Sequence, residues 1–269
     1  MVLSSECCRQ CTIYPILNTL LRYFLDIAYN GARYHGWQLQ NNAHTLQAEV
    51  EDGLSKLFRQ PMRITGSGRT DTGVHARQQL VHFDVDLELE QELEAWLYKI
   101  NAVLPPDIWA KSLRPVKPEV HARYSALSRR YEYYICRHKD PFRQKQVYYF
   151  HRPLDVGKMN EAAALMLQWE DFECFSKIHT NVKHFRCQVW EARWVDTGDD
   201  LVFYVAANRF LRNMVRAIVG TLLQVGQGRM TVQEFQEVLE SRDRSKAGRS
   251  APADGLFLVE VKYPDDIYL

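Results

Sequence analysis

The segment best suited to chemistry is the run GSGRTDTGVHA at residues 66–76. Small and polar residues dominate this run, so it cannot fill a core, but it lets the backbone approach a ligand closely. A single carboxylate, Asp71, lies between two threonines and two positions after Arg69. An aspartate in such a setting can act as a nucleophile that bonds to a substrate and is later released.

Two other interpretations of this segment need no catalysis. Asp71 can cap a turn through the amides of its own loop, as aspartate often does beside glycine. A phosphate-binding loop is excluded, because the lysine of G-x-x-x-x-G-K-[ST] is absent and the sixth position of G-x-G-x-x-G is Asp71. The local sequence therefore leaves a turn cap and a catalytic carboxylate as alternatives.

Charge is balanced over the whole chain, so any basic surface must be local. The 269 residues carry a formal net charge of +1, with 46% hydrophobic residues, which is typical of a globular protein with a substantial core. One stretch, residues 121–146, holds seven arginines and lysines against Glu132 and Asp140, and tyrosines alternate with them. This composition is typical of an RNA-binding face, although a solvated strand and loop is the simpler alternative.

Cysteine usage and hydropathy indicate a protein of the reducing cytoplasm, with no membrane span. The six cysteines do not form the regular pattern of a disulfide framework, and no apolar run reaches the roughly 18 residues that a span needs. Residues 1–20 look like an extension that is loosely docked at best. Cys8 and Cys11 have half the spacing of a zinc ribbon, but no second pair lies nearby, so free thiols are expected there.

The elements that must position Asp71 follow the same order twice. In the first half we expect a strand opening at Arg22, a helix within 44–60 capped by Thr45, a short strand at 62–65, a strand over 78–86, an amphipathic helix over 88–101 and a strand over 107–116. In the second half we expect a strand over 128–138, a helix over 155–169, two strands joined at 197–200, helices over 210–226 and 231–243, and a final strand over 255–263.

Each half thus approximates β-α-β-β-α-β, the ferredoxin-like order. We predict an α+β fold in which two ferredoxin-like halves form one extended mixed or antiparallel sheet, with helices on one side and a central active-site cleft. The expected boundaries are an N-terminal extension at 1–20, a first half at 21–118 that carries the Asp71 loop, and a second half at 119–269.

Six segments in order resemble the pseudouridine synthases of the TruA type. The signature is GRTDTGVHA at 68–76, and the other matches are YNGARYHGWQLQ (29–40), INAVLPPDI (100–108), HARYSALSRRYEYYI (121–135), NRFLRNMVRAIVG (208–220) and GLFLVEVKYP (255–264). The resemblance extends from about Arg22 to Pro264. It implies an isomerase that converts uridine to pseudouridine in the anticodon stem-loop of tRNA, at nucleotides 38 to 40. It also implies a homodimer, and since the reaction is redox-neutral, it requires no cofactor or metal.

The resemblance also assigns roles to individual residues. Asp71 matches the catalytic nucleophile, Arg216 the arginine that forms an ion pair with it, and Arg69 the arginine that enters the space left by the flipped base. Tyr131 matches the tyrosine that stacks on the target base and can assist proton removal; spacing alone does not distinguish it from Tyr133, which lies on the same strand face. The HARYS segment matches a tRNA-contact loop, which makes His121, Arg123 and Tyr124 candidates for substrate binding.

Two competing functions are consistent with parts of this pattern. A non-catalytic RNA-binding protein on the same framework would retain RNA affinity without chemistry, which leaves Asp71 and Arg216 unexplained. A glycoside hydrolase would need a second carboxylate beside Asp71, and the loop provides none.

Overall fold

The computed structural model describes residues 20–177 and 182–269. The expectations for the extension and for Cys8 and Cys11 fall on residues 1–19 and lie outside the described residues. Cys136, Cys174 and Cys187 are free and buried. No described helix is both long enough and apolar enough to cross a bilayer.

Nine strands of the described ranges form one mixed sheet with the path β4-β1-β3-β9-β5-β8-β7, to which β2 adds beside β3 and β6 beside β5. The strands of the first half are β1 (Leu21–Tyr29), β2 (Thr65–Gly66), β3 (His75–Val85) and β4 (Ile108–Val116). The strands of the second half are β5 (Ser128–Cys136), β6 (Tyr148–Tyr149), β7 (Val189–Asp196), β8 (Asp200–Ala207) and β9 (Leu256–Lys262).

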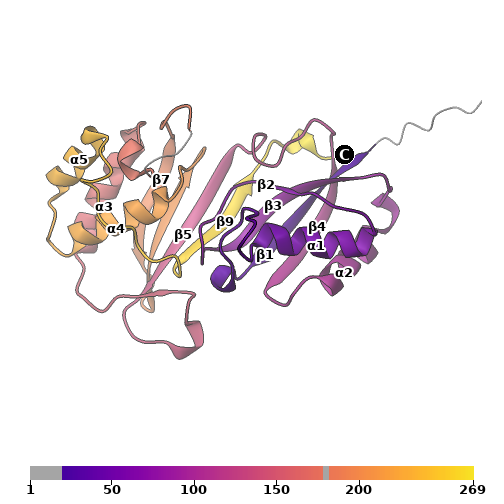
Figure 1. Ribbon diagram of the computed structural model, residues 1–269. Coiled ribbons are helices and arrows are strands. Elements are labelled where there is room, and N and C mark those ends of the chain that lie inside the picture. Colours follow the sequence, from indigo (N-terminus) through magenta and orange to yellow (C-terminus); the bar gives the residue numbers. More distant parts are fainter. Residues whose placement is uncertain (1–19, 178–181) are drawn as a thin grey trace, which may run out of the picture.

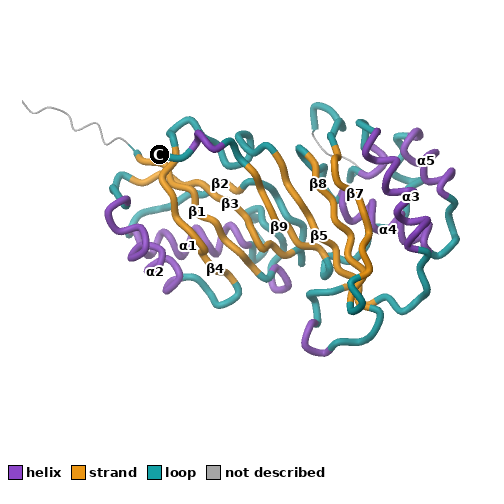
Figure 2. The backbone as a smooth tube through the Cα atoms, turned by 180° about the vertical axis from the view of Figure 1, so that it is seen from behind, coloured by secondary structure: helices purple, strands orange, loops and turns teal. Residues whose placement is uncertain are grey.

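Five α-helices of the described residues cover this sheet. They are α1 (Leu46–Phe58), α2 (Leu93–Val103), α3 (Val156–Leu165), α4 (Met214–Gly226) and α5 (Val232–Ser241). The helices lie in front of the strands in Figure 1, and the view from behind in Figure 2 brings the strands to the front. The predicted α+β class with helices on one side of the sheet is confirmed.

Both halves have the ferredoxin-like strand order. In the first, β4-β1-β3-β2 are neighbours, and in the second, β9-β5-β8-β7 are neighbours, with antiparallel pairing throughout each set. The halves join where the first residues of β3 pair in parallel with β9, His75 opposite Phe257 and Ala76 opposite Leu258. We call this two-residue junction the seam. The segment 66–76, which carries Asp71, includes the seam residues His75 and Ala76 as its last two positions.

The core fills the layer between the helices and the sheet. In the first half, helix α1 contributes Leu46, Val50 and Leu54, which are fully buried at the helical spacing expected from the sequence. In the second half, Ile218 and Leu222 of α4 are fully buried. The predicted caps are confirmed: the Thr45 hydroxyl accepts from the Ala48 amide, and Thr231 and Glu234 form a capping box.

The short strand predicted at 62–65 is wrong in position, because the structure places β2 at Thr65–Gly66. The preceding amides donate to side chains of α1 instead of a neighbouring strand: Met62 N–H to the Ser55 hydroxyl at 2.9 Å and Ile64 N–H to the Glu51 carboxylate at 3.1 Å. Side-chain acceptors on α1 thus take the place of the main-chain partners that a strand at 62–65 would have had.

Candidate active site

The loop that carries Asp71 is fixed by backbone contacts with the segment after β1. The Trp37 amide donates to the carbonyl of Thr70 at 3.0 Å, and the hydroxyls of Thr70 and Tyr29 lie 2.8 Å apart in a buried hydrogen bond. Gly36 has φ of +88°, and a Cβ there would lie 2.7 Å from the Thr70 carbonyl oxygen. Only glycine allows the two segments to approach so closely, and this approach sets the position of Asp71.

The Asp71 carboxylate faces the second half of the molecule. Its Oδ2 lies 3.4 Å from Nη1 of Arg216, and the two side chains are 27% and 22% exposed. The turn is closed by the main chain, since the Val74 amide donates to the Asp71 carbonyl at 3.1 Å. The carboxylate is therefore not used as the turn cap that the sequence had left as an alternative, and the ion pair remains accessible to a substrate.

Arg216 is held at the first turn of α4. Its Nε donates to the Ala251 carbonyl at 2.8 Å, and its own carbonyl accepts from the Ala251 amide at 2.9 Å. The sequence predicted that Gly220, one turn later, allows another element to approach, and this is confirmed: a Cβ there would lie 1.8 Å from the Arg249 carbonyl oxygen. The segment after Arg249 thus packs directly on α4 and orients the guanidinium.

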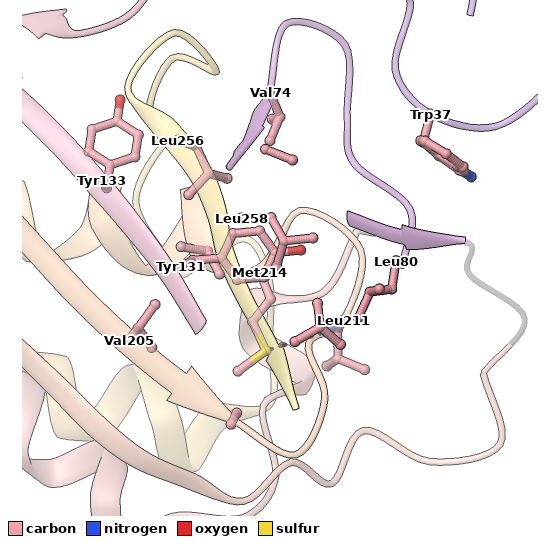
Figure 3. Packing of buried hydrophobic residues seen from close by; sticks show 14 of the residues in the cluster. Trp37, Val74, Leu80, Tyr131, Tyr133, Val205, Leu211, Met214, Leu256 and Leu258 are labelled. Carbon is pink, nitrogen blue, oxygen red and sulfur yellow. Dashed lines mark hydrogen bonds between the residues drawn. The ribbon is translucent and has the colours of Figure 1, made fainter. Parts of the chain in front are cut away.

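Tyr131 lies at the centre of the sheet, next to the seam. It pairs with Val205 of β8 on one side and Leu258 of β9 on the other, and Figure 3 shows Tyr131 and Leu258 close to Met214 of α4, with Val205 apart from them. The Tyr131 ring is 9% exposed and meets Phe210 edge-on, with centroids 5.1 Å apart. This row of buried side chains fixes the ring in one orientation.

The two candidate tyrosines differ in their surroundings. Burial raises the pKa of Tyr131 to about 12; the charge of Arg129 opposes this rise and the charge of Asp71 adds to it, so the phenol is neutral near pH 7. Tyr133 is fully buried, and its hydroxyl donates to the Pro252 carbonyl at 2.8 Å. The charge of Asp71 thus affects the pKa of the Tyr131 phenol. Tyr133 instead forms a hydrogen bond with the segment that holds Arg216.

The candidate RNA-contact residues gather around a second feature, a cavity of about 180 Å³ between the loop at 66–69 and the HARYS segment. Arg69, His121, Arg123 and Tyr124 all line it. Arg69 and Arg123 are exposed, and the His121 and Tyr124 rings lie 4.4 Å apart. Among the described residues no carboxylate lines this cavity, which we call the loop cavity. The structure therefore brings these four predicted residues together.

One residue of the site had no distinguishing signal in the sequence. The Arg129 guanidinium donates to the carbonyls of Ser67 (3.0 Å), Arg123 (2.6 Å), Ala126 (3.1 Å) and Asn208 (2.9 Å). Burial lowers the pKa of this guanidinium. Arg129 therefore connects the Asp71 loop, the HARYS segment and, through Asn208, the segment between β8 and α4. In the sequence it is only one of seven basic residues that could equally face RNA.

Ion pairs neutralise much of the basic stretch at 121–146. The pairs are Arg130 with Glu191 at 3.0 Å, Arg137 with Asp196 at 2.8 Å and Arg143 with Asp200 at 2.6 Å. These carboxylates come from β7 and β8, so a count of charges along the stretch could not include them. Among the described residues, no cluster of three or more histidines, cysteines or acids is arranged to hold a metal ion.

The chain is similar to proteins of one family along most of its length. A family described as tRNA pseudouridine synthase matches residues 27–125 and 162–264. The tRNA pseudouridine synthase A of Porphyromonas gingivalis is 47% identical over 253 residues, which cover 93% of this chain and all of that protein. The protein of the same name from Bacillus subtilis is 38% identical over 247 residues, covering 90% of this chain and 99% of that protein.

Proposed function

Since the chain belongs to the tRNA pseudouridine synthase family, whose members are isomerases, we propose that it converts uridine to pseudouridine in the anticodon stem-loop of tRNA, at nucleotides 38 to 40. The observation that carries the proposal is the Asp71–Arg216 ion pair, which links the two halves beside Tyr131. We further propose a homodimer that works in the cytoplasm, as expected from the sequence.

The reaction moves one bond and leaves the composition of the nucleotide unchanged. The bond from N1 of uracil to C1′ of ribose breaks, a bond from C5 to C1′ forms, the hydrogen on C5 leaves as a proton and N1 gains a proton. Asp71 supplies the nucleophile that bonds transiently to the base or the sugar and is expelled again. Arg216 lies opposite this carboxylate, with its Nη1 3.4 Å from Oδ2, and orients it.

The target uridine must leave its stack to reach Asp71, which costs a few kcal/mol. We assign to Tyr131 the surface on which the extruded base stacks, a contact that contributes about 1 to 3 kcal/mol. The raised pKa of Tyr131 favours this role over that of a general base in the free enzyme, because the neutral phenol can only donate its proton. Arg69, exposed at the mouth of the loop cavity, occupies the space left in the RNA.

The test uses unmodified tRNA with tritium at C5 of uridine, since isomerisation must release that label to water. The wild-type protein is expected to release tritium, and Asp71→Asn to lose at least about 10⁴-fold in kcat while still binding tRNA. Asp196→Asn, which removes only the carboxylate of an exposed ion pair, is the matched control and keeps full activity. Turnover by Asp71→Asn at the wild-type rate would reject the assigned nucleophile, and RNA binding without tritium release by the wild type would reject the enzyme.

A further inference from the structure

A second, larger cavity lies in the half of the molecule that does not carry the Asp71 loop. Its volume is about 600 Å³, and it opens between the later turns of α4, the segment 148–152 and the segment 249–252. Its polar lining includes Arg152, Arg229, Arg249, His151, Gln224 and Gln227, and no carboxylate in the described part of the chain lines it. We call it the helix cavity. The family resemblance assigns a role to none of these side chains, and the site described above involves only the main chain of Arg249.

The three arginines of the helix cavity are exposed and have no acidic partner. None of their guanidinium groups lies within 4.0 Å of a carboxylate of the described residues, whereas Arg130, Arg137 and Arg143 nearby are all paired. In a chain of net charge +1, three uncompensated cations around one cavity create a local positive potential. Such a potential attracts an anion, and guanidinium groups suit the oxygens of a phosphate.

The remaining lining fits a nucleotide chain better than a lone ion. The rings of Tyr149 and His151 lie 5.8 Å apart at 30°, and Tyr149 is 42% exposed, so it offers a surface to a base or ribose. Gln224 and Gln227 add amide donors, which often contact the sugar-phosphate backbone. The loop cavity has the same chemistry, with two arginines, a histidine, two glutamines, a tyrosine and no acid.

The wall of the helix cavity is continuous with the catalytic ion pair. Ala251, which lines the cavity, exchanges two backbone-directed hydrogen bonds with Arg216, at 2.8 and 2.9 Å. Arg249, also in the wall, packs its carbonyl against Gly220. An RNA segment seated in this cavity would therefore contact the same piece of chain that holds the guanidinium opposite Asp71.

We propose that the helix cavity is a second RNA-binding site, which holds a phosphodiester segment of the tRNA outside the nucleotide that is isomerised. The proposal rests on the proposed function for the identity of the RNA. Its arginines bind the substrate and the transition state alike, so they contribute to affinity and not to the chemical step.

The test compares two triple variants that remove the same charge. Arg152→Gln with Arg229→Gln and Arg249→Gln alters the helix cavity, and Lys56→Gln with Arg59→Gln and Lys99→Gln removes three exposed cations of the first half as the matched control. The dissociation constant for unmodified tRNA is measured over about 50 to 200 mM salt, together with kcat from tritium release. Thermal unfolding monitors the fold, and if a triple variant is unfolded, the single variants are measured.

The cavity variant is expected to bind tRNA about 10- to 100-fold more weakly at about 150 mM salt, with a salt slope smaller by about 2 to 3, while kcat stays within about threefold of the wild type. Each single variant should lower the slope by about 1. A cavity variant with the same affinity and slope as the control overturns the proposal. So does a variant that loses affinity for a free nucleoside monophosphate but not for tRNA, because the cavity would then serve a small anion.

Failure of this proposal is distinct from failure of the proposed function. If the wild type releases no tritium, the isomerase assignment fails whatever the variants bind. If the wild type releases tritium and the cavity variant binds tRNA normally, only the second RNA site is rejected.

Discussion

The two halves share one strand order but present their reactive groups in different ways. The first half carries Asp71 on an irregular loop, which is positioned by close backbone contacts such as that of Gly36 with the Thr70 carbonyl. The second half carries Tyr131 within a central strand and Arg216 within a helix, where regular hydrogen bonds fix the main chain. The difference teaches that one framework can supply an approachable carboxylate on a loop and a rigidly held guanidinium opposite it.

This difference implies different sensitivities to mutation. Where backbone packs on backbone, added volume should disturb the site even if no charge changes. Where side chains project from regular elements, the loss of charge or of a donor should matter more than volume. The following predictions test that contrast in order of decreasing effect.

The largest effect is expected for Arg216→Gln in the second half. We expect kcat to fall by about 10² to 10³-fold, because the carboxylate loses its charged partner in a partly buried site. Arg216→Lys keeps the charge but replaces two separate donors, Nε toward the Ala251 carbonyl and Nη1 toward Asp71, with a single nitrogen, so an intermediate rate is expected. Single-turnover tritium release measures the rates of both variants. The control is Arg137→Gln, which breaks only the exposed ion pair of Arg137 with Asp196. A wild-type rate for Arg216→Gln would contradict the role of the ion pair.

A smaller effect is expected for Gly36→Ala in the first half. The new methyl group would meet the Thr70 carbonyl at 2.7 Å in a backbone of φ +88°, so the Asp71 loop must shift. We expect about a tenfold loss of kcat and about 2 kcal/mol less stability against unfolding. Gly198→Ala is the control, since Gly198 has φ of +89° and open space around its Cα, and it should cost only about 1 kcal/mol with full activity. Equal behaviour of the two variants would show that volume at Gly36 is unimportant.

The smallest effect concerns His82, which supports the connection between the halves. Its Nδ1 accepts from the Ala122 amide at 3.0 Å, and burial, together with the charge of Arg22, lowers the pKa of His82 to about 4. Between about pH 4 and 6.5 the unfolded chain therefore binds a proton that the folded protein excludes, so stability falls as pH falls through this window and is constant above it. We expect His82 to account for about 1 to 2 kcal/mol of this loss.

Denaturant unfolding at pH 7 and pH 4.5 measures the effect. His82→Gln should reduce the pH dependence but not abolish it, because the pKa of His121 is also lowered, mainly by burial. A variant at position 82 with the full wild-type dependence would show that this imidazole is not the group that titrates.

Much of the fold was predictable from the sequence because it depends on local patterns. The helical spacing of Leu46, Val50 and Leu54, the cap at Thr45 and the close approach at Gly220 are each encoded within a few residues. The α+β class and the order of the two halves followed from these patterns. The resemblance also marked the loop that carries Asp71 and its partner Arg216, and the structure places the two side chains 3.4 Å apart. That main-chain atoms, and not the carboxylate, close the turn was not predictable from the sequence.

Features that depend on distant partners were not predictable in the same way. The period of a strand indicates which face is buried but not which strand is its neighbour, so the pairing of Ala76 with Leu258 had no sequence signal. The carboxylates that neutralise Arg130 and Arg137 lie about sixty residues further along the chain. Arg129 looked like its basic neighbours, and only the positions of four carbonyls distinguish it.

The seam has a consequence for how the protein is made. Strand β9 follows every other described strand in the chain, yet it lies between β3 and β5 and pairs with both. We therefore expect a nascent chain on the ribosome to hold two separate half-sheets until β9 has emerged. Asp71 and Arg216 should come to face each other only after that strand has been inserted, late in translation.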